Sequence, residues 1–225
     1  MEKVQTVLFD FDGTLADTSR GIYNSIRYAL GEVGIPVGDE SRLREFIGPP
    51  LYESFETVYG VDPDEASRLV DLYRVYYGKS GVFECDLYPG VSELLEVLSS
   101  SRTSGGPQSL AIVSSKPLHF LKVVLPHLGI DSCFDAVVGP ELKNKNSDKS
   151  FLIDRALKTL GVPADHAAAM VGDRFYDMEG AVRAGITAIG VTWGFGPAEE
   201  LTASGAEALA ATPRELTGVL GAARK

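Results

Sequence analysis

Two aspartates separated by one residue, Asp10 and Asp12, follow an apolar run near the start of the chain. The run at residues 4–9 predicts a buried parallel strand that delivers both carboxylates to its carboxyl end. Ionised carboxylates are costly to bury alone, and a divalent cation with a preference for oxygen ligands would neutralise them. The stretch therefore indicates a metal-assisted active site. Taken alone, it is equally compatible with a turn or an Asx-capped helix start, whereas its glycine spacing does not fit an EF-hand loop.

Two further apolar runs also end in polar residues. Residues 110–113 lead into Ser114-Ser115-Lys116, and residues 167–171 lead into Gly172-Asp173, with Asp177 close behind. In open parallel sheets, ligands bind at the carboxyl ends of the strands. Each motif alone is also explained by helix capping, and the convergence of all three is what favours a site.

The order of the expected elements indicates a parallel sheet wrapped by helices. Strands are predicted at 110–113, 136–138, 167–171 and 188–191, and helices at 91–98, 117–128, 149–160 and 176–184. Strand and helix alternate in this part of the chain, as in α/β proteins. Residues 99–109 are rich in serine and glycine and are expected to form a loop. Residues 17–84 show helical patterns only, which predicts a helical insertion between residues 1–16 and residues 85–225.

Composition narrows the possible partners and the compartment. The formal net charge of −10 makes nucleic acid and anionic lipid poor partners. The two cysteines, Cys85 and Cys133, have no CxxC spacing, which fits a reducing compartment. We find no signal-peptide pattern and no apolar run of transmembrane length. A cytoplasmic protein without membrane or nucleic-acid partners is therefore expected.

The motifs and their order resemble the haloacid-dehalogenase-like hydrolase superfamily. The resemblance spans nearly the whole chain and is carried by DFDGTLADT at 10–18, SSKP at 114–117 and VGDRFYD at 171–177. The segments FIGPPL at 46–51 and WGFG at 193–196 are most similar to the phosphoglycolate-phosphatase and 5′-nucleotidase-like branch. The resemblance implies a Rossmann-like core with an α-helical cap, Mg²⁺ as cofactor and a phosphoric monoester hydrolase activity.

The resemblance also implies roles for four aspartates. Asp10 is the expected nucleophile, which forms an aspartyl-phosphate, and Asp12 is the expected general acid and base. Mg²⁺ would be held by Asp10, the backbone carbonyl of Asp12 and Asp173. Asp177 would support the metal through water or orient a lysine. Because Asp12 supplies a proton that a halide leaving group does not need, its presence argues against dehalogenation.

The expected phosphate ligands are Ser114, Ser115 and a lysine. Ser114 offers a hydroxyl and Ser115 a backbone N–H. Lys149 is chosen because it begins a helix and precedes an Ala-Leu pair by the branch's spacing, and Lys145 is the alternative. A lysine at a helix N-terminus opposes the dipole and needs an anionic partner.

The predicted activity is Mg²⁺-dependent hydrolysis of a small phosphorylated metabolite, such as a nucleoside monophosphate, phosphoglycolate or a sugar phosphate. A phosphomutase of the β-phosphoglucomutase type is the first alternative, because it shares every core residue. A non-catalytic binding protein that kept the fold is the second. Arg44 and Gly48, in a segment that resembles the family's substrate-facing loop, are candidate specificity residues. A monomer or a homodimer is expected.

Overall fold

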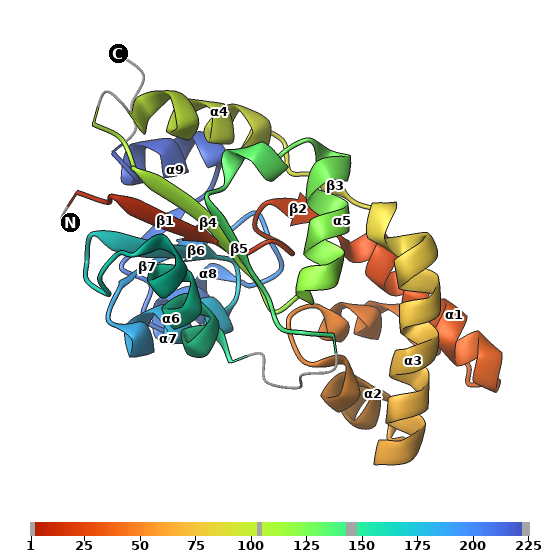
Figure 1. Ribbon diagram of the computed structural model, residues 1–225. Coiled ribbons are helices and arrows are strands. Elements are labelled where there is room, and N and C mark those ends of the chain that lie inside the picture. The colour runs from red at the N-terminus through yellow and green to blue at the C-terminus, as the bar shows by residue number, and fades with distance from the viewer. Residues whose placement is uncertain (1–2, 103–104, 143–147, 222–225) are drawn as a thin grey trace. The chain divides into compact units, whose positions relative to one another are not determined.

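The computed structural model describes residues 3–102, 105–142 and 148–221 (Figure 1). Contacts divide the chain into two compact units, Met1–Ala16 with Leu87–Lys225, and Asp17–Asp86. The sequence patterns place the second boundary slightly earlier, between residues 84 and 85. A short two-stranded sheet, β2 (Ala16–Asp17) and β3 (Asp86–Leu87), marks the two places where the chain passes between the units.

The first unit is built on a parallel sheet of six strands in the order β5-β4-β1-β6-β7-β8. Its central strand β1 is buried along its whole length. Such a strand needs apolar side chains on both faces, which explains the continuous apolar run in the sequence. The bounds of the strands are β1 Thr6–Phe9, β4 Ser109–Val113, β5 Ala136–Val138, β6 Ala168–Gly172, β7 Thr187–Val191 and β8 Ala208–Ala210.

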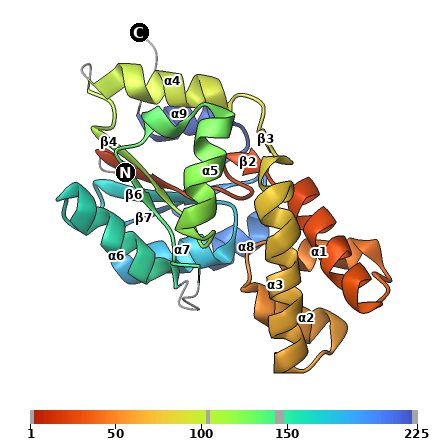
Figure 2. The ribbon, with the colours of Figure 1, turned by 45° about the vertical axis from the view of Figure 1, so that its right-hand side comes forward.

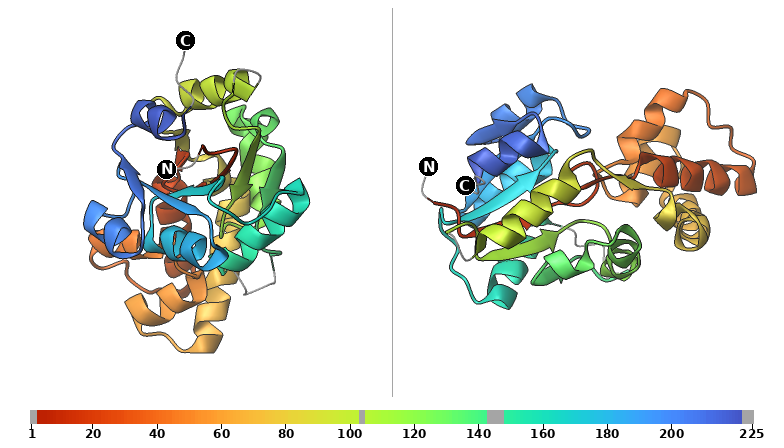
Figure 3. Two further views of the ribbon diagram at one scale, coloured as in Figure 1. Left: turned by 90° about the vertical axis from the view of Figure 1, so that its left-hand side faces the viewer. Right: turned by 90° about the horizontal axis from the view of Figure 1, so that it is seen from above.

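Helices cover both faces of this sheet (Figure 3). On one face, α4 (Val91–Ser101) lies beside α9 (Pro213–Val219), and on the opposite face α6 (Lys149–Leu160) lies beside α7 (Phe175–Ala184) (Figure 1). The core under α6 and α7 joins Leu8 and Met170 from the sheet to Ile153 and Met178 from the helices. The unit also contains α5 (Leu118–Leu128), the short helix η4 (Asp131–Cys133) and α8 (Ala198–Ala203). The α/β class expected from the sequence is confirmed.

Two parts of the first unit differ from the prediction. Helix α4 continues to Ser101, so the expected loop at 99–109 begins later than predicted. Leu98 is buried and keeps this turn against the core, although the serines that follow are weak helix formers. The strand β8 and the helices α8 and α9 were not predicted, because these elements are short and their patterns brief.

The second unit is helical, as the sequence indicates. Its elements are α1 (Ser19–Val33), η1 (Glu40–Phe46), α2 (Leu51–Tyr59), α3 (Pro63–Lys79) and η2 (Gly81–Phe83). Helix α1 packs along α3, and α3 also contacts α2 (Figure 2). Ile26, Leu30, Leu69 and Phe55 are fully buried, so the unit has an apolar core of its own. Among the described residues of the chain, no helix is long and apolar enough to cross a membrane.

Candidate active site

The three motifs meet at the carboxyl ends of β4, β1 and β6, which are neighbours in the sheet. Phe9, the last residue of β1, is in register with Ile112 of β4 and Val171 of β6. The residues that follow these positions, Asp10, Ser114 and Asp173, therefore emerge at one edge. The backbone N–H of Asp10 donates to the carbonyl of Val171 at 2.9 Å, which continues the ladder to the site.

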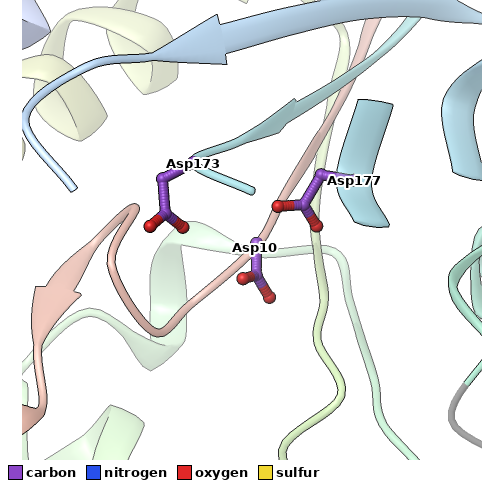
Figure 4. A group of neighbouring side chains, drawn as sticks. All are labelled: Asp10, Asp173 and Asp177. Carbon is purple, nitrogen blue, oxygen red and sulfur yellow. The ribbon is translucent and has the colours of Figure 1, made fainter. Parts of the chain in front are cut away.

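Three buried carboxylates lie together at this edge (Figure 4). Asp10 comes from the loop after β1, Asp173 follows β6, and Asp177 lies in the first turn of α7. One oxygen of each lies within 4.8 Å of one oxygen of the others. Asp173 and Asp177 are at most 1% exposed, and Asp10 is 8% exposed. This arrangement requires a balancing positive charge, since like charges repel strongly at such depth.

Lys149, the first residue of α6, supplies part of that charge. Its Nζ donates to Asp10 Oδ1 at 3.0 Å and to the carbonyl of Val113 at 3.2 Å, and lies 2.7 Å from Asp177 Oδ1. The anionic partners needed by a lysine at a helix N-terminus are thus Asp10 and Asp177. Lys145 lies outside the described residues.

Burial and neighbouring charges shift the acidities of this group. Burial raises the pKa of Asp10 to about 6, with Asp177 and Asp12 adding to the rise and Lys149 opposing it. Burial also raises the pKa of Asp173 well above its usual value, helped by the charges of Asp177 and Asp10. Burial alone would lower the pKa of Lys149, but the carboxylates of Asp10 and Asp177 outweigh it and raise that pKa. The ammonium of Lys149 therefore stays charged.

Asp173 is held by two donors from other segments. Thr14 Oγ1 donates to Asp173 Oδ1 at 3.1 Å, and the backbone N–H of Phe195 donates to Oδ2 at 2.8 Å. Trp193 Nε1 donates to the carbonyl of Thr14 at 3.0 Å. Gly13 adopts φ +86° and packs so closely that a Cβ there would overlap Asp173 Oδ2. The Thr14 and Trp193 contacts were not anticipated from the sequence, although both residues lie inside the quoted motifs.

Asp12 faces a different partner. Both of its carboxylate oxygens accept hydrogen bonds from Lys116 Nζ, at 2.7 and 3.0 Å. The backbone N–H of Lys116 donates to Ser114 Oγ at 3.2 Å, which closes a turn directly after β4. The Asp12 side chain is thus outside the three-carboxylate group, and Lys116 is a second site residue that sequence reasoning left without a role. Its place in the SSK motif was the available signal.

The described residues fit a divalent cation in number, depth and charge. Four carboxylates, those of Asp10, Asp12, Asp173 and Asp177, face two ammonium groups, those of Lys116 and Lys149. Asp177 Oδ1 is fully buried and accepts no hydrogen bond within the described part of the chain, although Lys149 is close. A buried carboxylate oxygen with spare acceptor capacity can accept a hydrogen bond from a water molecule held by Mg²⁺ or Ca²⁺.

The remaining predicted residues are placed as follows. Ser114 is buried at the end of β4 and Ser115 beside it is half-buried. Arg44 and Gly48 belong to the second unit, within and just after η1, and both are exposed. The structure thus gathers Asp10, Asp173, Asp177 and Lys149. The roles predicted for these four residues stay predictions, as do those of Asp12, Ser114, Ser115, Arg44 and Gly48.

Comparison with known proteins agrees with this site. The haloacid dehalogenase-like hydrolase family matches residues 7–191, and the chain belongs to that family. A curated 5′-nucleotidase of Pseudomonas aeruginosa is 40% identical over 197 residues, which cover 88% of this chain and 86% of the relative. The tyrosine-protein kinase PtkA of Mycobacterium tuberculosis is 34% identical over 222 residues, covering 98% of this chain and 74% of the relative.

A solved structure extends the likeness to the fold. The crystal structure of a predicted phosphatase from Clostridium acetobutylicum superposes with a TM-score of 0.87 at 40% identity, covering 96% of this chain and 98% of that one. Family, fold and phosphatase relatives together make this chain a phosphoric monoester hydrolase that acts on phosphorylated small molecules.

Proposed function

We propose that the protein is a Mg²⁺-dependent phosphatase of small phosphorylated metabolites that works through an aspartyl-phosphate on Asp10. The observation that carries the proposal is the buried group of Asp10, Asp173 and Asp177, paired with Lys149, at the carboxyl edge of the sheet. Such a group is costly to bury for structure alone. It has the composition that phosphoryl transfer needs: a nucleophile, cation ligands and a fixed positive charge.

Asp10 and Asp173 would hold the cation directly, together with the backbone carbonyl of Asp12. Asp177 would act through a water molecule or through Lys149. When bound, Mg²⁺ neutralises the carboxylates and the substrate phosphate and polarises the phosphoryl group. Thr14 and the Phe195 N–H orient Asp173 for this purpose.

In the first step, an oxygen of Asp10 forms a bond to phosphorus while the bond from phosphorus to the ester oxygen breaks. The electron pair of the breaking bond goes to the ester oxygen, which takes a proton from Asp12 and leaves as an alcohol. The non-bridging oxygens would be bound by Lys149, the Ser114 hydroxyl and the Ser115 N–H. Ser114 Oγ accepts a hydrogen bond from the Lys116 N–H, so the hydroxyl hydrogen of Ser114 points away from that group and can be donated to a phosphate oxygen.

In the second step, a water molecule attacks phosphorus and gives a proton to Asp12. The bond between Asp10 and phosphorus breaks, inorganic phosphate is released, and Asp10 returns as a carboxylate. Asp12 thus ends the cycle in the protonated form with which it began. Lys149 stays beside Asp10 throughout and stabilises the carboxylate as it leaves.

A nucleoside monophosphate is the substrate class that we favour, because the 40% identical relative is named a 5′-nucleotidase. Phosphoglycolate and sugar phosphates are the other candidates. Arg44, an exposed cation of the second unit, is proposed to bind the part of the substrate beyond the phosphate, with Gly48 in the same loop. The expected state is a monomer or homodimer in the cytoplasm, without nucleic-acid partners.

The test is a steady-state screen of phosphate release with Mg²⁺ across nucleotides, phosphoglycolate and sugar phosphates. Asp10→Asn should abolish turnover, and Asp12→Asn should lower it roughly 10²–10⁴-fold, the usual size of general acid–base catalysis. Near-normal hydrolysis by Asp10→Asn would contradict the mechanism.

The same screen distinguishes two other activities, those of a phosphomutase and of a tyrosine kinase, from a phosphatase. Conversion of β-glucose 1-phosphate to glucose 6-phosphate without phosphate release would identify a mutase. Because one relative is named a tyrosine-protein kinase, labelled ATP with a tyrosine peptide is included. Phosphopeptide formed faster than free phosphate would overturn the phosphatase proposal.

A further inference from the structure

Lys116 is a buried lysine that the steps above do not use. Its side chain is 5% exposed, and its ammonium lies 2.7 Å from Asp12 Oδ1 and 3.0 Å from Oδ2. The ammonium also lies 5.6 Å from the centre of the Phe11 ring. A lysine normally keeps its charged end in water, so a buried ammonium aimed at one carboxylate calls for a specific explanation.

The fold explains how the two side chains meet. Asp12 follows β1 and Lys116 follows β4, and these strands are paired in parallel with Phe9 opposite Ile112. The turn after β4 is closed by the hydrogen bond from the Lys116 N–H to Ser114 Oγ. One three-residue turn therefore carries a proposed phosphate ligand and the partner of the proposed general acid and base.

Without Lys116, the Asp12 side chain is expected to change its rotamer. Its side chain is 18% exposed, more than that of any carboxylate in the buried group, so it has a path toward solvent. Asp10 is close enough for its charge to interact with that of Asp12. Repulsion from the buried carboxylates favours a rotamer that points away from them.

We propose that Lys116 is a positioning residue that holds the Asp12 carboxylate where it exchanges its proton with the reacting oxygens. The inference rests on the proposed function, in which Asp12 is the general acid and base. Proton transfer requires the carboxyl group within hydrogen-bond reach of the ester oxygen. Because the ammonium contacts both oxygens of Asp12, it keeps the carboxylate turned toward Lys116 and away from solvent.

The test compares leaving groups. A poor leaving group, such as the alcohol of an alkyl phosphate, needs the proton from Asp12, whereas 4-nitrophenolate leaves without one. We compare kcat/KM values, because these report the steps up to departure of the leaving group and not the later hydrolysis. Lys116→Met should lower kcat/KM at least about tenfold for an alkyl phosphate and less than about threefold for 4-nitrophenyl phosphate, a part of the effect of losing the general acid.

Two further variants distinguish a positioning role of Lys116 from a general loss of structure. Lys116→Arg keeps a cation with two donors and should restore most of the lost kcat/KM. In the double variant Lys116→Met with Asp12→Asn, no buried charge is left alone, and kcat/KM should equal that of Asp12→Asn. Lys122→Met, at an exposed lysine of the neighbouring helix α5, is the matched control and should behave as the unmodified protein.

Two results would overturn the inference while leaving the proposed function in place. One is an equal loss for both leaving groups in Lys116→Met, which indicates a phosphate ligand or a folding defect. The other is a further loss when Lys116→Met is added to Asp12→Asn. If Asp12→Asn itself shows no dependence on the leaving group, the role of Asp12 and the inference about Lys116 both fail.

Discussion

A substitution at Thr14 should lower the affinity of the proposed metal site for Mg²⁺ while leaving every carboxylate in place. Thr14 is 1% exposed, and its hydroxyl donates to Asp173 Oδ1 at 3.1 Å. Thr14→Val replaces the hydroxyl with a methyl group of the same shape, so the packing is retained and the hydrogen bond is lost. Of the two hydrogen bonds to Asp173 described above, the variant keeps the one from the backbone N–H of Phe195, at 2.8 Å.

The expected change in metal affinity follows from the charge state of Asp173. Burial raises the pKa of this carboxyl, so a proton competes with the cation, and the Thr14 hydrogen bond favours the ionised form. A hydrogen bond to a charged group contributes roughly 1.5–3 kcal/mol. At about 1.4 kcal/mol for each factor of ten, the apparent dissociation constant for Mg²⁺ should rise about 10- to 100-fold.

Isothermal titration of the metal-free protein with Mg²⁺ measures this constant directly. Emission of Trp193, the single tryptophan of the chain, gives a second readout, because its Nε1 donates to the backbone carbonyl of Thr14, which the substitution retains. Thr159→Val is the matched control, since Thr159 is exposed on α6 and bonds only along its own helix in the contacts described. A folded Thr14→Val protein with an affinity within about twofold of the unmodified protein would refute the reasoning.

Other expectations concern pH, a helix cap and two glycines. Because burial raises the pKa of Asp10 to about 6 and also raises that of Asp173, the apparent dissociation constant for Mg²⁺, measured by titration calorimetry, should rise at least about tenfold per pH unit well below pH 6; a flat profile would contradict this. Asp148 caps α6, and Asp148→Ala should cost about 1 kcal/mol in unfolding by urea while Asp148→Asn restores the cap. Since hydrogen bonding to Ser150 lowers the pKa of Asp148, this loss should be constant at neutral pH and shrink below about pH 4, as the carboxyl takes a proton. Gly180→Ala should lower kcat, because a Cβ there lies 2.7 Å from Lys149 Cγ, whereas Gly31→Ala, with open space around it, should stabilise its helix by about 0.5–1 kcal/mol in the same urea titration.

The strands that carry the site were predictable because each combines an apolar run with a polar end. Parallel strands bring their carboxyl ends to one edge of the sheet, so the sequence pattern predicts that Asp10, Ser114 and Asp173 lie close together. Lys149 was preferred over Lys145 because it begins the helix and has the branch's spacing, and the structure pairs Lys149 with Asp10 and Asp177.

The contacts that the sequence did not predict join side chains from segments that are far apart in the sequence. Trp193 is separated from Thr14 by 179 positions, and no local pattern indicates that its indole N–H donates to that segment. Lys116 was noted in the SSK motif, but its contact with Asp12 depends on the register of β1 and β4 and on the turn that follows β4. Strand β8 was missed because its three residues alternate in burial over too short a length.

The stereochemical course at phosphorus tests the aspartyl-phosphate most directly. A substrate whose phosphoryl group is made chiral with oxygen isotopes is hydrolysed, and the configuration of the released phosphate is determined. Attack by Asp10 followed by attack by water gives two in-line displacements, and each inverts the phosphorus centre. The proposed mechanism therefore predicts retention of configuration, whereas inversion would show a single direct attack by water and would contradict the role of Asp10 as the nucleophile.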